Sequence, residues 1–287
     1  MIISEKFLSA ASTSELTEGT VIYGGDSGGE SAPGFRFILE GDLIVTRGPD
    51  ALGRYHEIGQ LTKHEFFGEM SLLADDSTHF ATVTVRSPTA RLIYFDPAAF
   101  LEEVRSNHQF CIGLIRVVLQ RTERIENQLH RRRQSAVHVL PPLPALRARL
   151  CEKNMDLIDY LGKSRLGFAA PGTKFFQTGQ ADERCVYAIV SGEAVLSFTN
   201  DEREYDIMRL VEGDIYGTHV FMNSRPRALA IRAVSEYVRF AFIDRDLFRK
   251  TLLLDPALFL NVFQYFSWNL MRLDQIYYEL LAAQIEA

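Results

Sequence analysis

The chain repeats one sequence pattern twice. A Gly-Thr turn followed by an alternating apolar run occurs from Gly19 ("GTVIYGG") and again from Gly172 ("GTKFFQTGQ"). Next comes a strand-like segment, a glycine with an acidic neighbour and a second strand-like segment, with the glycines at Gly41 and Gly192. Alternation with a period of two residues is typical of strands that bury one face. The repeat therefore predicts a duplicated β unit.

The two copies continue in parallel to their ends. The segment "IGQLTKHEFFGEMSLL" corresponds to "IMRLVEGDIYGTHVFM", so that Gly68 corresponds to Gly217. A short helical pattern and then a long one close each copy. We expect Gly41 and Gly192 to form the corners of β-hairpins. The predicted fold is mainly β with helices: two β-rich units near residues 15–105 and 168–246, each capped by a long C-terminal helix.

A proline-containing linker separates the copies and sets the predicted domain boundaries. Pro141, Pro142 and Pro144 break any helix there. The residues after them, 145–164, carry leucines and an isoleucine on one face and predict a helix that packs on the second unit. We therefore expect a first domain at 1–134 with a long helix near 108–133, a linker and helix at 135–166, and a second domain at 167–287.

Composition narrows the class of protein. The 287 residues are 47% hydrophobic, which is ample for two ordinary cores, and the net charge of -6 provides no basic field for nucleic acid. Three scattered cysteines without metal-ligand spacing indicate a reducing compartment, and we expect a cytoplasmic protein. The N-terminus is too short and polar for a secretory signal, and no apolar run is long enough for a membrane span.

The order of these parts, with glycine corners followed by "FFGEMSLL", resembles the cyclic nucleotide-binding domain. That domain is the jelly roll of catabolite activator proteins and of the regulatory subunits of cAMP-dependent protein kinase. The resemblance covers nearly the whole chain in two copies and implies two jelly rolls in tandem. It also implies a signalling receptor that requires no cofactor and takes cAMP or cGMP as its ligand.

In this family a short helix after a Gly-Glu pair presents backbone N–H groups to the cyclic phosphate, and the glutamate accepts a hydrogen bond from the ribose. A later arginine neutralises the phosphate. In the first copy the resemblance assigns Gly68 and Glu69 to the pair and places Met70 and Ser71 in the short helix. The arginine position falls on His79, beside Phe80, or on Thr78 if the loop is one residue shorter.

In the second copy the pattern is reversed. Gly217 is followed by Thr218 and His219, so the acid is replaced by a hydroxyl, while the arginine survives as Arg227, followed by Ala228. Each copy therefore retains one half of the family's pocket. A protonated His79 could replace the arginine, the ligand could be a nucleoside or a cyclic dinucleotide, or the pockets could be vestigial. In the last case the chain would be a tandem jelly-roll scaffold for oligomerisation.

Further features bear on partners. The final helical segment is apolar around most of its circumference, and we expect it to hold a homo-oligomer, with Phe263 and Phe266 in the contact. Between Asp255 and the end of the chain Arg272 is the only basic residue, so we expect a protein partner and no DNA binding.

Two residue patterns remain. Arg132 to Ser135 ("RRQS") resembles a substrate site of a basophilic kinase, which makes Ser135 a candidate phosphorylation site. No histidines have the spacing of a metal site, and no nucleophile elbow or phosphate-binding loop of an enzyme occurs, so neither a metal nor catalysis is expected.

Overall fold

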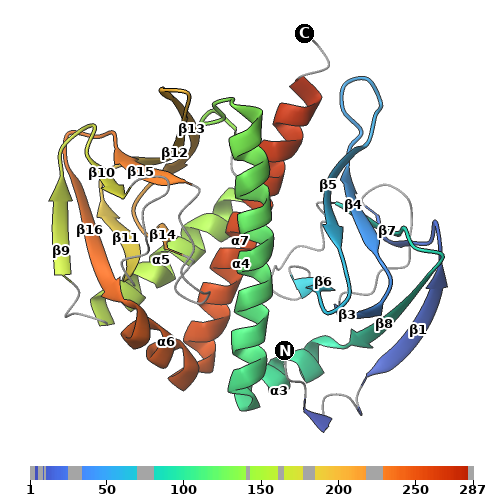
Figure 1. The fold of residues 1–287 in the computed structure, drawn as a ribbon. Helices are drawn as coiled ribbons and strands as arrows, with labels where there is room; N and C mark the ends of the chain where they lie inside the picture. Colours follow the sequence, from blue (N-terminus) through green and yellow to red (C-terminus); the bar gives the residue numbers. More distant parts are fainter. Residues whose placement is uncertain are drawn as a thin grey trace. The chain divides into compact units, whose positions relative to one another are not determined.

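The computed structural model divides the chain into two compact units. Met1–Val117 with Tyr278–Ala287 form the first, and Val118–Tyr277 form the second. The structure describes residues 4–5, 9, 11–24, 34–69, 81–139, 143–160, 165–176, 185–217 and 229–283 (Figure 1). The units divide within a helix, whereas the boundaries at 134 and 166 follow the sequence repeat and stay a prediction.

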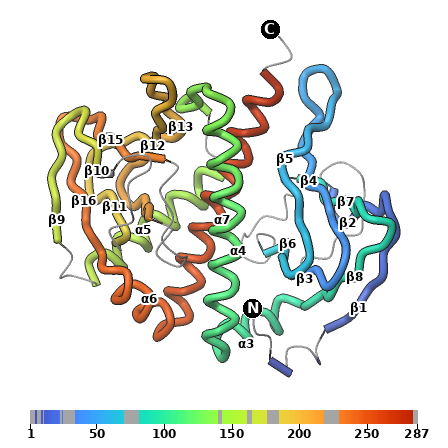
Figure 2. The backbone as a smooth tube through the Cα atoms, in the orientation of Figure 1, coloured from blue at the N-terminus to red at the C-terminus, as the bar shows by residue number. Residues whose placement is uncertain are grey.

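The strands of the first unit form two four-stranded antiparallel sheets. One has the order β1-β8-β3-β6 and the other β2-β7-β4-β5. The loop that joins β4 to β5 projects beyond its sheet (Figure 2). The strands are β1 (Ser12–Thr17), β2 (Val21–Tyr23), β3 (Phe35–Glu40), β4 (Leu43–Arg47), β5 (His56–Leu61), β6 (Phe66–Phe67), β7 (Thr82–Val85) and β8 (Thr89–Phe95).

The second unit repeats this topology strand for strand. Its sheets have the orders β9-β16-β11-β14 and β10-β15-β12-β13. The strands are β9 (Arg165–Ala169), β10 (Lys174–Phe176), β11 (Cys185–Ser191), β12 (Ala194–Asn200), β13 (Arg203–Leu210), β14 (Ile215–Tyr216), β15 (Ala230–Ala233) and β16 (Val238–Asp244). Among the strands that the structure describes, no sheet combines segments from before and after the proline-containing linker, and the predicted pair of jelly rolls is confirmed.

Five α-helices complete the described fold: α3 (Pro97–Ser106), α4 (His108–Arg132), α5 (Pro144–Tyr160), α6 (Arg245–Leu254) and α7 (Pro256–Ala283). The short helices α3 and α6 begin after Asp96 and Asp244, whose carboxylates accept hydrogen bonds from first-turn N–H groups. As expected, no described helix continues through Pro144, because α4 ends at Arg132. The proline itself belongs to the next helix. It begins α5, because the first helical residue needs no N–H partner. None of the described helices is long and apolar enough to cross a membrane.

The glycine corners are crossovers between sheets, not hairpins as predicted from the sequence. Gly41 joins β3 to β4, and Gly192 joins β11 to β12, and in both cases the two strands lie in different sheets. Their φ angles are 94° and 85°, and a Cβ would lie 2.7 Å from the Thr89 carbonyl or 2.2 Å from that of Tyr237. Only glycine fits so sharp a turn against neighbouring backbone.

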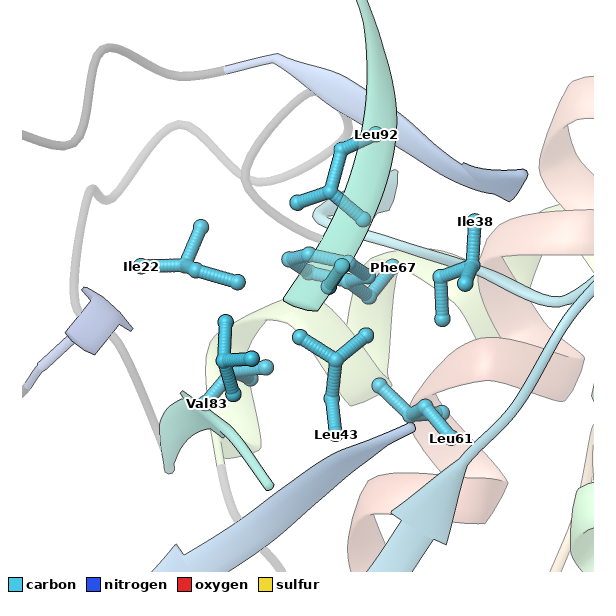
Figure 3. Packing of buried hydrophobic residues seen from close by; sticks show 9 residues of the cluster. Ile22, Ile38, Leu43, Leu61, Phe67, Val83 and Leu92 are labelled. Carbon is cyan, nitrogen blue, oxygen red and sulfur yellow. The ribbon is translucent and has the colours of Figure 1, made fainter. Parts of the chain in front are cut away.

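The core of each unit lies between its two sheets. In the first unit one buried cluster combines residues from both sheets (Figure 3). Burial of each valine, leucine, isoleucine or phenylalanine of the cluster stabilises the fold by about 1.5–3 kcal/mol. The cluster contains Ile22, Ile38, Leu43, Leu61, Phe67, Val83, Val85, Ala90 and Leu92. The two packed sheets hold the short strand β6, which directly precedes Gly68.

Candidate functional site

The short strands β6 and β14 deliver the two candidate phosphate cradles. β6 pairs with β3, and β14 pairs in the same way with β11. Both residues of β6 and both of β14 are buried. Each strand ends at the glycine that the sequence repeat assigned to the cradle, Gly68 after β6 and Gly217 after β14.

Both cradle glycines have backbone conformations that favour glycine. The φ angle is 86° at Gly68 and 121° at Gly217. A Cβ on Gly217 would lie 2.9 Å from the carbonyl oxygen of Cys185. In the first copy Glu69 follows directly, and only 4% of it is exposed. The first copy thus holds a buried carboxylate where the family's ribose acceptor is expected.

The turns before the two glycines share one pattern of hydrogen bonds. Glu65 accepts from the N–H of Thr62, and Asp214 accepts from the N–H of Val211. The preceding residue has a positive φ in both copies, 72° at His64 and 79° at Gly213. The copies differ in what covers this turn, because His64 is exposed whereas Gly213 lies under a helix.

The helix over the second turn is α5. A Cβ on Gly213 would lie 2.5 Å from the carbonyl oxygen of Cys151, so the turn and the helix backbone are in direct contact. The side-chain amide of Asn154 donates to the Gly213 carbonyl at 2.9 Å and accepts from Asn261 of α7 at 3.2 Å. Close approach of α5 therefore requires glycine at this position, a constraint that the exposed turn at His64 lacks.

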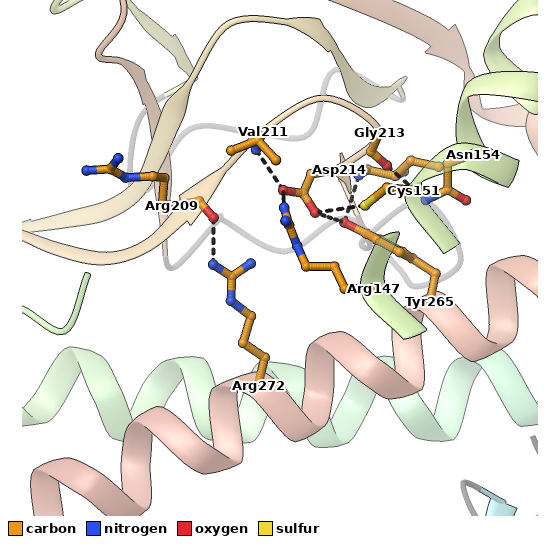
Figure 4. A network of polar contacts seen from close by, with 10 residues as sticks. Arg147, Cys151, Asn154, Arg209, Val211, Gly213, Asp214, Tyr265 and Arg272 are labelled. Carbon is orange, nitrogen blue, oxygen red and sulfur yellow. Dashed lines mark hydrogen bonds and ion pairs between the residues drawn. The ribbon is translucent and has the colours of Figure 1, made fainter. Parts of the chain in front are cut away.

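Asp214 is the centre of a buried polar network (Figure 4). Its carboxylate pairs with the guanidinium of Arg147 in α5 at 2.8 Å and accepts from the hydroxyl of Tyr265 in α7 at 2.9 Å. The same hydroxyl accepts from the N–H of Ile215 in β14 at 2.9 Å. With its side chain fully buried, Asp214 joins two helices to the strand that carries Gly217.

A second buried arginine lies close to this network. Arg272 of α7 is 5% exposed, donates to the Arg209 carbonyl at 2.6 Å and stacks over the ring of Trp268. Burial lowers the pKa of Arg272, and burial and the Asp214 charge raise the pKa of Tyr265. Arg272 is the isolated basic residue noted in the sequence, and its role here is structural.

The cradle strand has one more polar anchor, on α4. The Tyr216 hydroxyl donates to the buried carboxylate of Glu126 at 2.8 Å. Beside this bond lies a cavity of about 10 Å³, room for about one water molecule, lined also by Thr122 and Asn269. The cavity is too small for a nucleotide, so we assign it no ligand.

The described residues include only part of each predicted pocket. Gly68, Glu69 and Gly217 lie where the repeat predicts. Met70, Ser71, His79 and Phe80 of the first copy and Thr218, His219, Arg227 and Ala228 of the second lie outside the described residues. Their roles stay predictions. The described residues contain no group of three or more metal-binding side chains.

The aromatic residues predicted to hold an oligomer are used within the chain itself. Phe263 is 0% exposed and Phe266 is 2% exposed in the single chain. Charged residues at these positions would therefore disrupt the core and would not report specifically on self-association. The predicted homo-oligomer stays a prediction.

Two of the three cysteines are expected to be chemically inert in the folded protein. Burial raises the pKa of Cys111 and, together with the Asp214 charge, that of Cys151 to about 12 each. Cys185 is partly exposed. Because the thiolate is the reactive form, we expect one rapidly reacting thiol per chain at pH 8 with an aromatic disulfide reagent, and three after unfolding.

The same pKa shifts predict a loss of stability at high pH. The folded chain keeps both thiols neutral. Their contribution to the free energy of unfolding is therefore fully present below the unfolded pKa of about 8.5 and is lost as the pH rises towards 12.

In the labelling experiment, replacement of Cys185 by Ser should abolish the rapid labelling. Rapid labelling of Cys111 or Cys151 in the folded chain would contradict the assignment.

The described structure thus contains two copies of one jelly roll, each with a glycine of positive φ after a short buried strand. The cyclic nucleotide-binding domain family matches residues 15–107 and 168–255, and the chain belongs to this family.

Known proteins with similar sequences include two kinase components of Drosophila melanogaster. The type II regulatory subunit of cAMP-dependent protein kinase is 27% identical over 122 residues, 42% of this chain and 31% of its own length. Isozyme 1 of cGMP-dependent protein kinase is 28% identical over 190 residues, 65% of this chain and 21% of its own. The chain thus spans a third or less of these relatives.

A solved structure of similar type is the regulatory domain of Toxoplasma gondii PKA in a co-crystal with cAMP. It is 20% identical to this chain, and the match covers 86% of this chain and 85% of that one with a TM-score of 0.29.

Proposed function

We propose that this protein is a non-catalytic cytoplasmic receptor of the cyclic-nucleotide type, which transmits its ligand state to a protein partner. Its ligand is cAMP or cGMP, and it acts without DNA and without a membrane. The two relatives are components of cAMP- and cGMP-dependent kinases, so the partner we propose is a protein kinase or a protein of similar regulatory role.

One observation supports this proposal: the candidate cradle of the second copy directly follows residues that belong to the buried polar contacts. Gly217 follows Asp214, Ile215 and Tyr216, and each of these three residues is hydrogen-bonded to a helix. A ligand that repositions the backbone after Gly217 must strain or relax those bonds. The helices α5 and α7 would then present the ligand state to a partner.

Calorimetry on the purified full chain tests the proposal directly. The panel contains cAMP, cGMP, cyclic dinucleotides, adenosine and guanosine, with thermal unfolding followed in parallel. A ligand that binds only the native state at 100 times its Kd should add about 2.7 kcal/mol to the free energy of unfolding. Slower amide exchange in α5 and α7 with the ligand bound would support transmission through the network.

The remaining outcomes each decide against part of the proposal. Binding of nucleosides alone would indicate a nucleoside receptor that uses Glu69 of the first copy, where no arginine is present for a phosphate. Absence of heat and of any midpoint shift with every compound would overturn the receptor function. It would favour a tandem scaffold without a ligand.

A further inference from the structure

The segment between the two domains carries a basic motif that the receptor function does not use. Arg131, Arg132 and Arg133 precede Gln134 and Ser135. Ser135 is the only serine or threonine of the chain with basic residues at both the second and third preceding positions.

The structure presents this serine on an exposed turn after a helix. α4 ends at Arg132, and Arg133 has a left-handed backbone with a φ of 55°. Ser135 is exposed, and its Oγ accepts a hydrogen bond from the N–H of Asp206 at 3.1 Å. The N–H of Ala136 donates to the Asp206 carbonyl at 2.7 Å. The segment is therefore attached to β13, an outer strand of its sheet.

Two of the three arginines before Ser135 are exposed, Arg131 and Arg133. Arg133 pairs with Asp201, but both side chains are more than half exposed, and such ion pairs contribute little. Arg132 is half-buried, stacks over the ring of Tyr277 and donates to its hydroxyl at 3.5 Å. A kinase that recognises arginines could bind this side of the segment at small cost.

We propose that Ser135 is a phosphorylation site for a basophilic serine/threonine protein kinase, and that the phosphate releases residues 135 and 136 from β13. The Oγ of Ser135 attacks the γ-phosphorus of ATP. A new O–P bond forms, the bond from that phosphorus to the β,γ-bridging oxygen breaks, ADP leaves and the hydroxyl proton passes to a base of the kinase.

Release follows from the surroundings of the Oγ. A phosphoserine carries a charge of about -1.5 to -2 at pH 7. Asp206 and Glu204 already add negative charge to β13, and both are paired with Arg232, with Lys174 also on Glu204. Arg232 and Lys174 already pair with these acids and are not available to the phosphate of Ser135. The phosphate therefore attracts Arg133 away from Asp201. This inference does not depend on the nucleotide pockets.

The acceptor site is tested on the full chain with ATP and the catalytic subunit of cAMP-dependent protein kinase as the probe enzyme. Mass spectrometry should find one phosphate, on Ser135, and Ser135→Ala should abolish it. Replacement of Arg132 by Gln and Arg133 by Asn should lower kcat/KM about tenfold or more. The control Ser106→Ala, an exposed serine with only Arg105 before it, should have no effect.

Phosphate found only at other residues, or on Ser135 only after heat denaturation, would overturn the acceptor assignment. Release is tested by hydrogen exchange of the phosphorylated and unmodified chains. The amides of Ala136 and Asp206 should exchange about tenfold faster or more after phosphorylation. The Ala136 N–H loses its bond to the Asp206 carbonyl, and the Asp206 N–H loses its bond to the Oγ of Ser135. Equal exchange at both amides would overturn the release.

Discussion

Replacement of Asp214 by Ala should lower the free energy of unfolding of the second unit by about 3–5 kcal/mol, as expected when one partner of a buried ion pair is removed. The variant leaves Arg147 without its carboxylate and the Tyr265 hydroxyl without its acceptor. The N–H of Val211 also loses its partner. Asp214→Asn should cost less, because the amide oxygen can still accept one of these bonds.

Urea unfolding followed by tryptophan fluorescence measures this loss. The chain has one tryptophan, Trp268 in α7, so its signal reports on the second unit. The guanidinium carbons of Arg147 and Arg272 lie 5.8 and 5.6 Å from the centre of its ring. The matched control is Glu65→Ala in the first copy, which removes the corresponding turn contacts at a half-buried site. Because Trp268 does not lie in the first unit, both variants are also followed by far-ultraviolet circular dichroism, which reports on both units. Glu65→Ala should cost about 0.5–1.5 kcal/mol. Equal losses in the two variants would show that the helix contacts of Asp214 add nothing.

The sequence predicted the duplicated framework because its signals are local. Glycines such as Gly41 and Gly192, with strand patterns on both sides, mark a sharp turn wherever they occur. The same local signal fits a hairpin and a crossover between sheets, since both need a positive φ. Pairing between β3 and β8, or between β11 and β16, decides the matter, and that pairing is set by residues about 50 positions apart.

The Asp214 network could not be predicted from neighbouring residues. Arg147, Asp214 and Tyr265 are each more than 50 positions from the next, and a turn that contains Asp is ordinarily exposed. One signal was present in the sequence. Arg272 is the single basic residue of a long apolar segment, and such a charge implies a buried polar partner.

For the two candidate cradles the sequence is more informative than the described structure. Gly68, Glu69 and Gly217 mark the framework, whereas the residues that distinguish the copies lie beyond them. The copies differ by an acid in the first and an arginine in the second. This complementary loss gives opposite expectations for substitutions in the two pockets.

In the second copy, replacement of Arg227 by Ala should weaken cyclic nucleotide binding by about 1.5–3 kcal/mol, or roughly 10–100-fold in Kd, because a charge-assisted contact to phosphate is removed. Thr218→Glu should tighten binding, since it restores an acceptor for the ribose hydroxyl next to Gly217. The control is Arg239→Ala, an exposed arginine of β16 in the same unit, which should leave the Kd unchanged.

In the first copy the resemblance predicts His79 at the phosphate position, and histidine carries charge only when protonated. Binding of an anionic ligand beside the buried Glu69 should therefore strengthen as the pH falls below about 6.5, and His79→Arg should remove that pH dependence. Calorimetry with cAMP and cGMP at pH 5.5 and 8 measures both effects. If neither His79→Arg nor Thr218→Glu binds either nucleotide, the retained halves are not parts of a nucleotide site. Gly217 would then be kept for its close backbone contact alone, as the 2.9 Å distance to the Cys185 carbonyl already requires.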